Sequence, residues 1–403
     1  MDIALSFNHI NFFMGKSFKT FLKHTAKDFH NQSVNPPVVR ASTIIFKSMK
    51  HIRKTQKKAQ KNPVGGHYDY GRQGTSTTYI LQKILTKLED SYHVFTTPTG
   101  FGSVFLAIFS VVRPGDEIIA ADPVYSPTRV LTQDFLKEFN IKTIFYNPHD
   151  LKTLERSITK KTKLIFVENP GSITFEFQDL KEIIKLAKKK KIFTALDNTW
   201  GTPLYLKPIP LGFDASIYSA TKYFSGHSDA MGGTLAVNKK IYSRINKYNR
   251  YLGSRLSADE AYLIIRGLRT LDVRLKAHYN NTIKVINFLK KQKKIKEVLY
   301  PYKPGTKNYK LWKKYYSGGT GLLSILIKAK NKSSVYKFVN KLELFGIGYS
   351  WGGYESLAIY QDIRKSRQYY KLANDEHLVR LHIGLEDPND LIKDLKNSLK
   401  YIK

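Results

Sequence analysis

Short apolar runs alternate with helical patterns through the middle of the chain, and polar residues or Gly and Pro end each run. Within residues 75–90, apolar side chains recur every three or four positions, which predicts an amphipathic helix. The runs that predict buried strands cover residues 117–122, 142–147, 163–170, 192–198, 215–220 and 233–237. This alternation predicts an α/β fold with a largely parallel, helix-covered sheet, which binds its ligands outside the carboxyl ends of the strands.

The two ends of the chain differ from this middle part. Residues 1–62 are basic, and we expect irregular structure there, with 34–43 as an extended arm because each Pro disfavours helix before it. A long helical stretch at 257–291 leads into further apolar runs at 321–329, 345–360 and 378–387. We therefore predict an N-terminal arm and segment (1–74), a ligand-binding α/β domain (75–270) and a C-terminal α/β domain (271–403).

Composition narrows the possible classes of protein. The 403 residues include no cysteine, which rules out disulfides, thiolate metal ligands and a cysteine nucleophile. Asp2 stands where a signal peptide would carry positive charge, and no window approaches the roughly 20 apolar residues that span a bilayer. His227 and Asp229 lack further spaced ligands, so we expect no metal. These features predict a soluble, cytoplasmic protein without a membrane partner.

The net charge of +35 raises the alternative of a nucleic-acid-binding protein. However, the lysines are scattered along helical stretches such as 180–191 and 287–298, and no aromatic–basic RNA motif or zinc knuckle accompanies them. We expect solvated helix faces and no nucleic-acid partner. A basic nucleic-acid-binding protein on a catalytically idle scaffold stays open as a rival, since a fold does not guarantee a function.

Lys222 is the first candidate for chemistry. It follows the predicted strand 215–220, and the stretch after it is rich in Gly, Ser, His and Asp. A lysine at the end of a core strand is either paired or lowered in pKa and used as a nucleophile. Asp197 ends another predicted strand, Tyr125 follows a third, and 96–104 leads from a strand into a helix that could bind phosphate. These are the parts that a pyridoxal-phosphate (PLP) enzyme requires.

Several longer motifs carry a specific resemblance. They are YGRQGTSTTYILQKILTKLED, VENPGSITFE, LDNTWGTPLY, SATKYFSGHSDAMGG, YSWGGYESL and VRLHIGLED, in this order along the chain. From about residue 35 to the C-terminus, the chain resembles the Cys/Met-metabolism family of PLP-dependent enzymes. The resemblance implies PLP as cofactor and the aspartate-aminotransferase-like fold type I. That fold has a mostly parallel seven-stranded sheet between helices, a smaller C-terminal α/β domain and an N-terminal arm.

Two departures point to a branch of this family. The γ-acting members typically read SPxNP and SLGG where this chain has NPGSI at 169–173 and YSWGG at 349–353. Both changes resemble the β-lyases, which cleave the carbon–sulfur bond of L-cystathionine to give homocysteine, pyruvate and ammonia in methionine biosynthesis. Amino-acid racemisation and cysteine- or γ-lyase activity stay open as alternatives.

The resemblance also implies a role for each residue that matches a family motif. Lys222 would carry the cofactor and move the substrate's Cα proton, Asp197 would hold the ring nitrogen, and Tyr125 would stack on the ring beside the substrate. The phosphate ligands would be Gly100, Phe101, Ser219 and Thr221. Arg380 would bind the substrate α-carboxylate, with Ser350 and Trp351 nearby. Tyr70 and Arg72 would reach the phosphate of a neighbouring protomer, which implies active sites shared between protomers and a homotetramer built as a dimer of dimers.

Overall fold

The structure is a computed structural model that describes residues 17–28, 32–62 and 64–403. The predicted absence of a signal peptide rests on Asp2 and its neighbours, which lie outside the described residues. The chain divides into two compact units. The first contains Met1–Val111, Lys207–Ser225 and Asp229–Thr270, and the second contains Val112–Leu206, Gly226–Ser228 and Leu271–Lys403. The boundaries expected at residues 74 and 270 stay a prediction.

The first unit combines three strands with the helices of the N-terminal region. Its elements are α2 (Phe18–His24), α3 (Met49–Lys61), η1 (Gly71–Gln73), α4 (Ser76–Glu89), β1 (His93–Thr97), α5 (Gly100–Phe109), α11 (Pro208–Leu211), β6 (Ala215–Ser219), β7 (Gly233–Val237), α12 (Lys239–Leu252) and α13 (Ala258–Leu268). Strand β7 runs antiparallel to both β1 and β6, and α5 packs on β6 and β7. Helix α4 follows the predicted amphipathic pattern, because its apolar face packs on β1 and α13.

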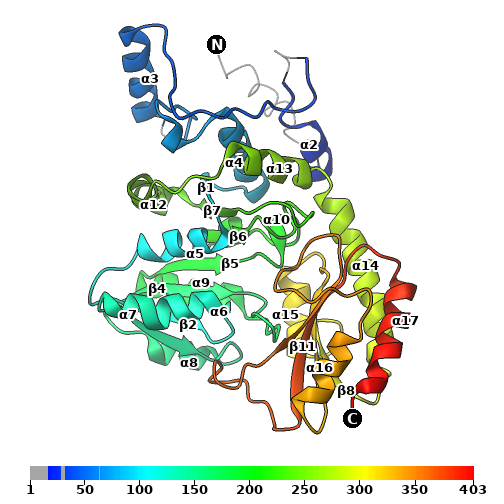
Figure 1. The fold of residues 1–403 in the computed structure, drawn as a ribbon. Helices are drawn as coiled ribbons and strands as arrows, with labels where there is room; N and C mark the ends of the chain where they lie inside the picture. The colour runs from blue at the N-terminus through cyan, green and yellow to red at the C-terminus, as the bar shows by residue number, and fades with distance from the viewer. Residues whose placement is uncertain (1–16, 29–31, 63) are drawn as a thin grey trace. The chain divides into compact units, whose positions relative to one another are not determined.

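The second unit contains the other strands of the first sheet and a separate small sheet (Figure 1). Its N-terminal elements are β2 (Glu117–Ala121), α6 (Ser126–Val130), the π-helix η2 (Leu131–Phe135), α7 (Leu136–Glu138), β3 (Lys142–Tyr146), α8 (Leu151–Ser157), β4 (Thr162–Glu168), α9 (Leu180–Lys190), β5 (Phe193–Asp197) and α10 (Thr202–Tyr205). Its C-terminal elements are α14 (Leu271–Leu289), β8 (Ile295–Leu299), α15 (Lys307–Tyr315), β9 (Leu322–Lys328), α16 (Lys332–Asn340), β10 (Leu357–Gln361), β11 (Glu376–His382), α17 (Pro388–Ser398) and η3 (Leu399–Tyr401).

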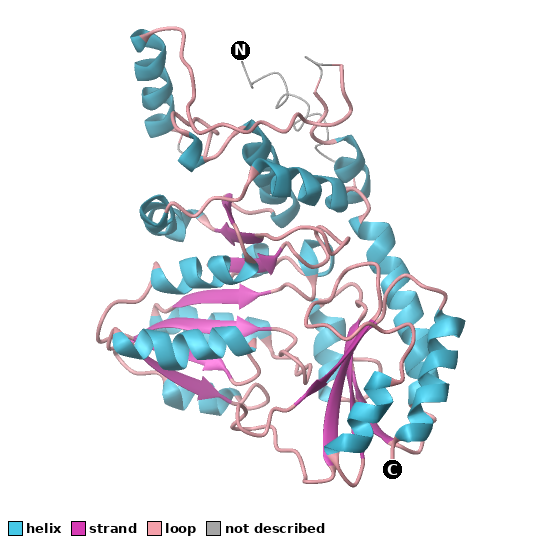
Figure 2. Ribbon diagram, viewed as in Figure 1, coloured by secondary structure: helices cyan, strands magenta, loops and turns pink. Residues whose placement is uncertain are grey.

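The strands form two sheets, which Figure 2 shows in magenta. The larger has seven strands in the order β1-β7-β6-β5-β4-β2-β3, and the smaller has four in the order β10-β11-β9-β8. Strands β2, β3, β4 and β5 pair in parallel, whereas the small sheet is antiparallel throughout. Each of the six predicted strands is present within a residue or two of its expected bounds, so the strand predictions are confirmed. The fully buried runs of β2 and β7 explain why their apolar patterns were continuous.

The expectation of irregular structure throughout residues 1–62 is wrong. Helix α2 and the 13-residue helix α3 both lie in this region, and Ser48 caps α3 by accepting the backbone N–H of His51. No residue of α3 is buried. Its sequence consists mainly of Lys, Arg, Gln and Ala, which favour helix without any apolar core to mark the period. A search for buried faces therefore missed it.

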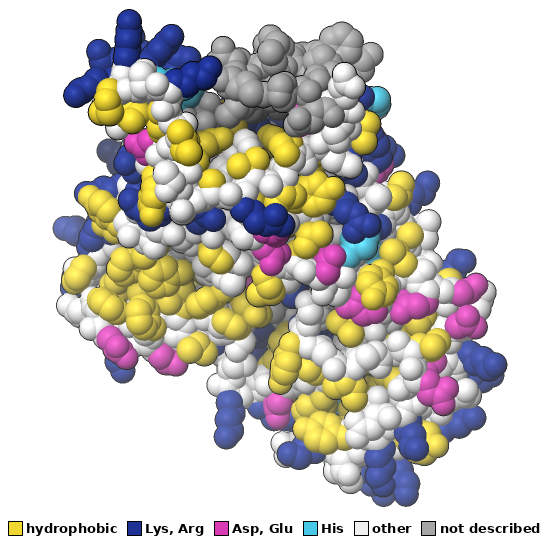
Figure 3. All heavy atoms as spheres, turned by 45° about the horizontal axis from the view of Figure 1, so that its top comes forward, with side chains coloured by type: hydrophobic (Ala, Val, Ile, Leu, Met, Phe, Trp, Pro, Cys, Tyr) yellow, Lys and Arg dark blue, Asp and Glu magenta, His cyan; other side chains and the backbone are white. Residues whose placement is uncertain are grey.

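Helix α3 concentrates positive charge on one side. Its six lysines and arginines lie three or four positions apart and therefore share one helix face. They are Lys50, Arg53, Lys54, Lys57, Lys58 and Lys61, and all are exposed. Ile52, Thr55 and Ala59, on the opposite face, are partly covered. Figure 3 shows basic side chains gathered over this part of the first unit.

The predicted helical stretch 257–291 is interrupted. Helix α13 ends at Leu268 and α14 begins at Leu271, with Arg269 and Thr270 between them. Gly267 lies so close to the backbone of Ser225 that a Cβ there would fall 2.2 Å from the Ser225 carbonyl oxygen. Among the described residues of the chain, no helix combines the length and apolar character needed to cross a membrane.

Candidate active site

Lys222 lies in a turn of the first unit, directly after β6. Its backbone N–H donates to the carbonyl oxygen of Ser219 at 3.1 Å, which folds the chain back as the strand ends. The hydroxyl of Ser225 donates to the carbonyl oxygens of Thr221 and Lys222 at 3.1 and 3.4 Å. Lys222 is half-buried, as its position after a core strand predicted. The turn therefore holds the backbone of Lys222 from both sides of the residue.

The N-terminus of α5 meets the end of β6 in the same unit. A Cβ built on Gly100 would lie 2.6 Å from both Cβ and Oγ of Ser219, so only glycine allows this approach. Thr99 caps α5 by accepting the N–H of Gly102 at 2.9 Å. Within the described chain, the backbone N–H groups of Gly100 and Phe101 donate to no acceptor, as expected for the first turn of a helix. Free N–H groups beside a serine hydroxyl suit a phosphate.

Thr221, the fourth predicted phosphate ligand, forms hydrogen bonds within the protein. Its hydroxyl accepts the N–H of Gly232 at 3.0 Å and lies 3.3 Å from the Gly232 carbonyl oxygen. These bonds tie the Lys222 turn to the segment that enters β7. The structure thus places Gly100 and Ser219 in contact and gives Thr221 a role in fixing the turn. Its binding to a phosphate stays a prediction.

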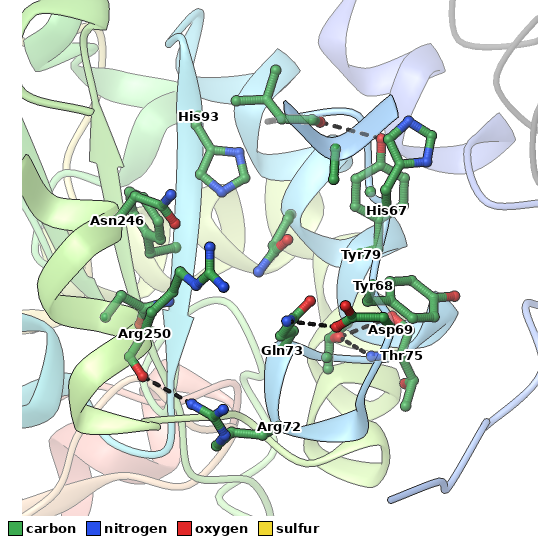
Figure 4. A pocket seen from close by; sticks show the side chains of 18 of the residues that line it. His67, Tyr68, Asp69, Arg72, Gln73, Thr75, Tyr79, His93, Asn246 and Arg250 are labelled. Carbon is green, nitrogen blue, oxygen red and sulfur yellow. Dashed lines mark hydrogen bonds between the residues drawn. The ribbon is translucent and has the colours of Figure 1, made fainter. Parts of the chain in front are cut away.

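Tyr70 and Arg72 stand apart from these residues within the first unit. Arg72 lines a cavity of about 510 Å³ whose lining includes none of Gly100, Phe101, Ser219 and Thr221. Figure 4 shows the Arg72 guanidinium donating to the backbone oxygen of Arg250, at 3.0 Å. Tyr70 and Arg72 are both exposed, and no carboxylate of the described residues forms an ion pair with Arg72. Both side chains are thus accessible to a ligand from outside their own unit.

Asp197 ends β5 in the second unit, as predicted. The backbone N–H and the hydroxyl of Thr199 both donate to its Oδ1, at 3.0 and 2.6 Å. In the described chain both hydrogen bonds to this carboxylate end on Oδ1, so Oδ2 is the atom that can meet a further donor. Burial raises the pKa of Asp197, and the two bonds from Thr199 oppose this shift. A nearby cation, such as a protonated pyridine nitrogen, would restore the ionised form.

Glu168 ends β4 directly beside Asp197 and was not among the residues singled out from the sequence. The two residues are register partners in the parallel pair β4–β5. Oε2 of Glu168 accepts the backbone N–H of Tyr125 at 2.6 Å. Burial and the charge of Asp197 raise the pKa of Glu168 well above its usual range. The strand-end position that drew attention to Asp197 applies equally to Glu168, and this signal could have identified it.

Tyr125 lies after β2 and is 46% exposed. Its pKa is raised by burial and by Glu168 and Asp197, and Arg380 opposes the shift. Three predicted site residues of the second unit, Tyr125, Asp197 and Arg380, are therefore near enough to interact electrostatically. An exposed aromatic face next to a carboxylate and a guanidinium is suited to covering a flat, charged ring.

Arg380 is a half-buried arginine that has no carboxylate partner among the described residues. Its Nη2 donates to the carbonyl oxygens of Tyr349 and Ser350, at 2.5 and 3.2 Å. Ion pairs in the described chain involve other arginines and not this one. Burial lowers the pKa of Arg380 to about 10, and Tyr125 only partly opposes this. Among the described residues, the geometry therefore gives Arg380 no structural salt bridge.

Ser350 and Trp351 precede a tight turn of the second unit. The carbonyl of Ser350 accepts from Arg380, so the predicted pair Arg380 and Ser350 is in contact. Gly352, with φ +88°, follows Trp351, and its N–H donates to Nε2 of His382 at 3.1 Å. His382 lies on the same strand as Arg380, two positions further on. The turn is thus held against β11, and the part of Trp351 in substrate binding stays a prediction.

The residues present fit PLP. In the first unit, the space above Gly100 that a Cβ would fill, the N–H groups of α5 and the hydroxyl of Ser219 could hold a phosphate; Ser219 lies three residues before Lys222. In the second unit, Asp197 can ion-pair with a ring nitrogen and Tyr125 can cover the ring. When bound, PLP withdraws electrons from the bonds of a substrate's α-carbon.

The comparison with known proteins identifies the class. The profile of the Cys/Met metabolism PLP-dependent enzyme family matches residues 19–400, nearly the whole chain. The chain belongs to this family, and its cofactor is PLP. The family membership and the PLP cofactor that the sequence motifs predicted are confirmed.

Individual relatives indicate which reactions occur among similar members of this family. Cystathionine β-lyase MetC of Escherichia coli is 34% identical over 92% of this chain and 94% of its own. An L-alanine/L-glutamate racemase of Wolbachia pipientis is 35% identical over 91% of this chain and 92% of its own. A solved metY structure from Campylobacter jejuni, which contains N′-pyridoxyl-lysine-5′-monophosphate, superposes with a TM-score of 0.85 at 28% identity and covers 95% of this chain and all of that one. The predicted fold type I and a PLP-dependent carbon–sulfur lyase are confirmed.

Proposed function

We propose that this enzyme cleaves L-cystathionine between Cβ and sulfur, releasing homocysteine, pyruvate and ammonia in methionine biosynthesis. The observation that supports the substrate class is the Arg380 guanidinium, for which the described residues supply no carboxylate. A half-buried arginine that donates to two carbonyl oxygens and still carries its full charge can bind a carboxylate, and every amino-acid substrate has a carboxylate on its α-carbon. The 34% identity to a cystathionine β-lyase along nearly the whole chain, together with NPGSI and YSWGG, favours this substrate.

Each residue then has a task in the elimination. Arg380 fixes the α-carboxylate and so decides which Cα bond is aligned for cleavage. Lys222 would hold the cofactor and would take the proton from the substrate's Cα. Asp197 would hold the ring nitrogen in its protonated form, and Tyr125 would cover the ring. The thiolate of homocysteine leaves from Cβ, and the remaining three-carbon fragment reacts with water to give pyruvate and ammonia.

The assembly and location follow the family resemblance. We infer a homotetramer of two dimers in the cytoplasm, in which Tyr70 and Arg72 of one protomer complete the phosphate site of the next. The exposure of both side chains and the absence of a carboxylate partner for Arg72 in the described chain support this arrangement. The domain boundaries at residues 74 and 270 belong to the same proposal.

Product analysis tests the reaction. Purified enzyme incubated with L-cystathionine should form pyruvate and homocysteine in equal amounts, and 2-oxobutyrate with cysteine would instead identify γ-cleavage. The relation to a racemase supports a second candidate activity, since Lys222 could return the Cα proton. Chiral analysis of L-alanine and L-glutamate incubated with the same enzyme tests it. Racemisation that is faster than pyruvate formation would overturn the lyase proposal.

A further inference from the structure

Glu168 has no assigned role, yet it lies next to two candidate site residues of the second unit, Tyr125 and Asp197. Its carboxyl accepts the backbone N–H of Tyr125, and its Cα is the register partner of Asp197. Neighbouring strands lie about 4.8 Å apart, and register partners point to the same face of a sheet. The Glu168 carboxyl group is therefore hydrogen-bonded to Tyr125, which would cover the cofactor ring. It also lies beside Asp197, which would hold the ring nitrogen.

Two adjacent carboxyl groups at a half-buried strand end do not both ionise readily. Coulomb repulsion at this separation favours one proton on the pair. The two members differ in their surroundings: Asp197 accepts two hydrogen bonds from Thr199, which stabilise its anion. Glu168 faces the negative charges of Asp197 and Glu176, while Arg367 and the Tyr125 N–H favour its ionised form. Burial of Glu168 outweighs these last two, since its pKa is raised well above the usual range.

We propose that Glu168 is a neutral positioning residue, which fixes the backbone of Tyr125 and leaves the negative charge of the carboxyl pair on Asp197. A neutral carboxyl still accepts the Tyr125 N–H through its carbonyl oxygen. An ionised Glu168 would instead push the proton onto Asp197, which would then hold a ring nitrogen weakly. This inference rests on the proposed function only for its activity readout, because cofactor binding can be measured without substrate.

Two substitutions distinguish the effect of the Glu168 side-chain length from the effect of its charge. Glu168→Gln keeps the length and the acceptor oxygen but cannot ionise. Glu168→Asp keeps an ionisable carboxyl but is one methylene shorter, so it cannot reach the Tyr125 N–H. Glu117→Gln is the matched control: Glu117 is buried in the same unit, its carboxylate accepts from the Thr159 hydroxyl at 2.6 Å, and it is not among the charged groups that act on Glu168.

PLP is titrated into each apoprotein, and the dissociation constant is read from the visible absorbance of lysine-bound cofactor. We expect Glu168→Gln to stay within about threefold of the parent in PLP affinity and kcat. Glu168→Asp should lose roughly three- to tenfold in PLP affinity, the worth of one lost hydrogen bond, and more in kcat. The control should change thermal stability without changing PLP affinity.

The opposite order overturns the proposal. If Glu168→Asp matched the parent while Glu168→Gln lost PLP affinity, Glu168 would act through its charge. If all variants bound PLP equally well, Glu168 would have no positioning role. Failure of the proposed substrate would look different: the PLP affinities would still rank as expected, and no variant, nor the parent, would form pyruvate from cystathionine.

Discussion

Replacing Arg380 by Met removes a charge from a half-buried position while keeping most of the side-chain volume. Lowering the pKa of a guanidinium from its ordinary 12.5 to about 10 means that the folded state disfavours the charge. Each pKa unit corresponds to about 1.4 kcal/mol, and after allowance for partial exposure the cost is on the order of 2 kcal/mol. Without PLP or substrate, Arg380→Met should therefore be as stable as the parent or more stable.

Catalysis should respond in the opposite direction. The α-carboxylate would lose charge-assisted hydrogen bonds worth about 1.5–3 kcal/mol, which corresponds to a roughly 10- to 150-fold fall in kcat/KM. The kcat/KM of Arg380→Lys should lie between that of the parent and that of Arg380→Met, because an ammonium supplies charge without the forked geometry. The measurements are kcat and KM for cystathionine, and Tm of the apoprotein by calorimetry.

Arg364→Met serves as the control for this prediction. Arg364 lies in the same unit and pairs with Asp362 at 3.2 Å, so its loss should leave KM unchanged. The reasoning would be refuted if Arg380→Met lowered the apoprotein's Tm strongly and left KM unaltered. That result would mean that Arg380 has a structural ion pair, whose loss typically costs about 3–5 kcal/mol when buried.

Four further predictions follow from the same contacts. Asp197→Asn should reduce kcat far more than PLP affinity, because an amide cannot balance a protonated ring nitrogen; an unchanged kcat would exclude the assigned role. Glu89→Gln should raise the free energy of unfolding at pH 7 by about 2 kcal/mol, because burial raises the pKa of Glu89 to about 8 and the parent loses stability as pH rises from about 4.5 to 8. Denaturant titrations at pH 5, 7 and 8 check this, and a pH-independent difference would contradict it. Random duplex DNA should bind weakly, with a salt dependence that becomes shallower when the lysines of α3 are replaced by Gln, whereas sequence-selective binding at physiological salt would restore the nucleic-acid hypothesis. Mixing inactive Lys222→Ala and Arg72→Ala proteins after dissociation should restore activity in hybrid dimers, and proven hybrids without activity would mean that Arg72 serves its own chain.

Much of the fold could be predicted because local patterns and burial agreed. Continuous apolar runs became the buried strands β2, β4 and β7, and the amphipathic period of 75–90 became α4. Helix α3 was missed because it has no buried face, so its helical period is carried by lysines and arginines and not by the apolar residues on which the helix predictions relied. The break between α13 and α14 was missed because both sides are helical in pattern and the interruption is only two residues long.

One part of the candidate site could likewise be predicted from the sequence, and another part could not. Lys222 and Asp197 were predictable, because each directly follows or ends an apolar strand and lies in a longer motif, and both features belong to the sequence itself. What only the tertiary structure decided is which polar groups meet. The hydrogen bond from Tyr125 to Glu168 joins residues 43 positions apart, and the register of β4 with β5 sets Glu168 beside Asp197. The lack of an acidic partner for Arg380 in the described chain is likewise a property of packing. Hydrogen bonds and charge repulsion act over a few ångströms in space, whatever the separation along the chain, so the protonation of this cluster follows from the fold.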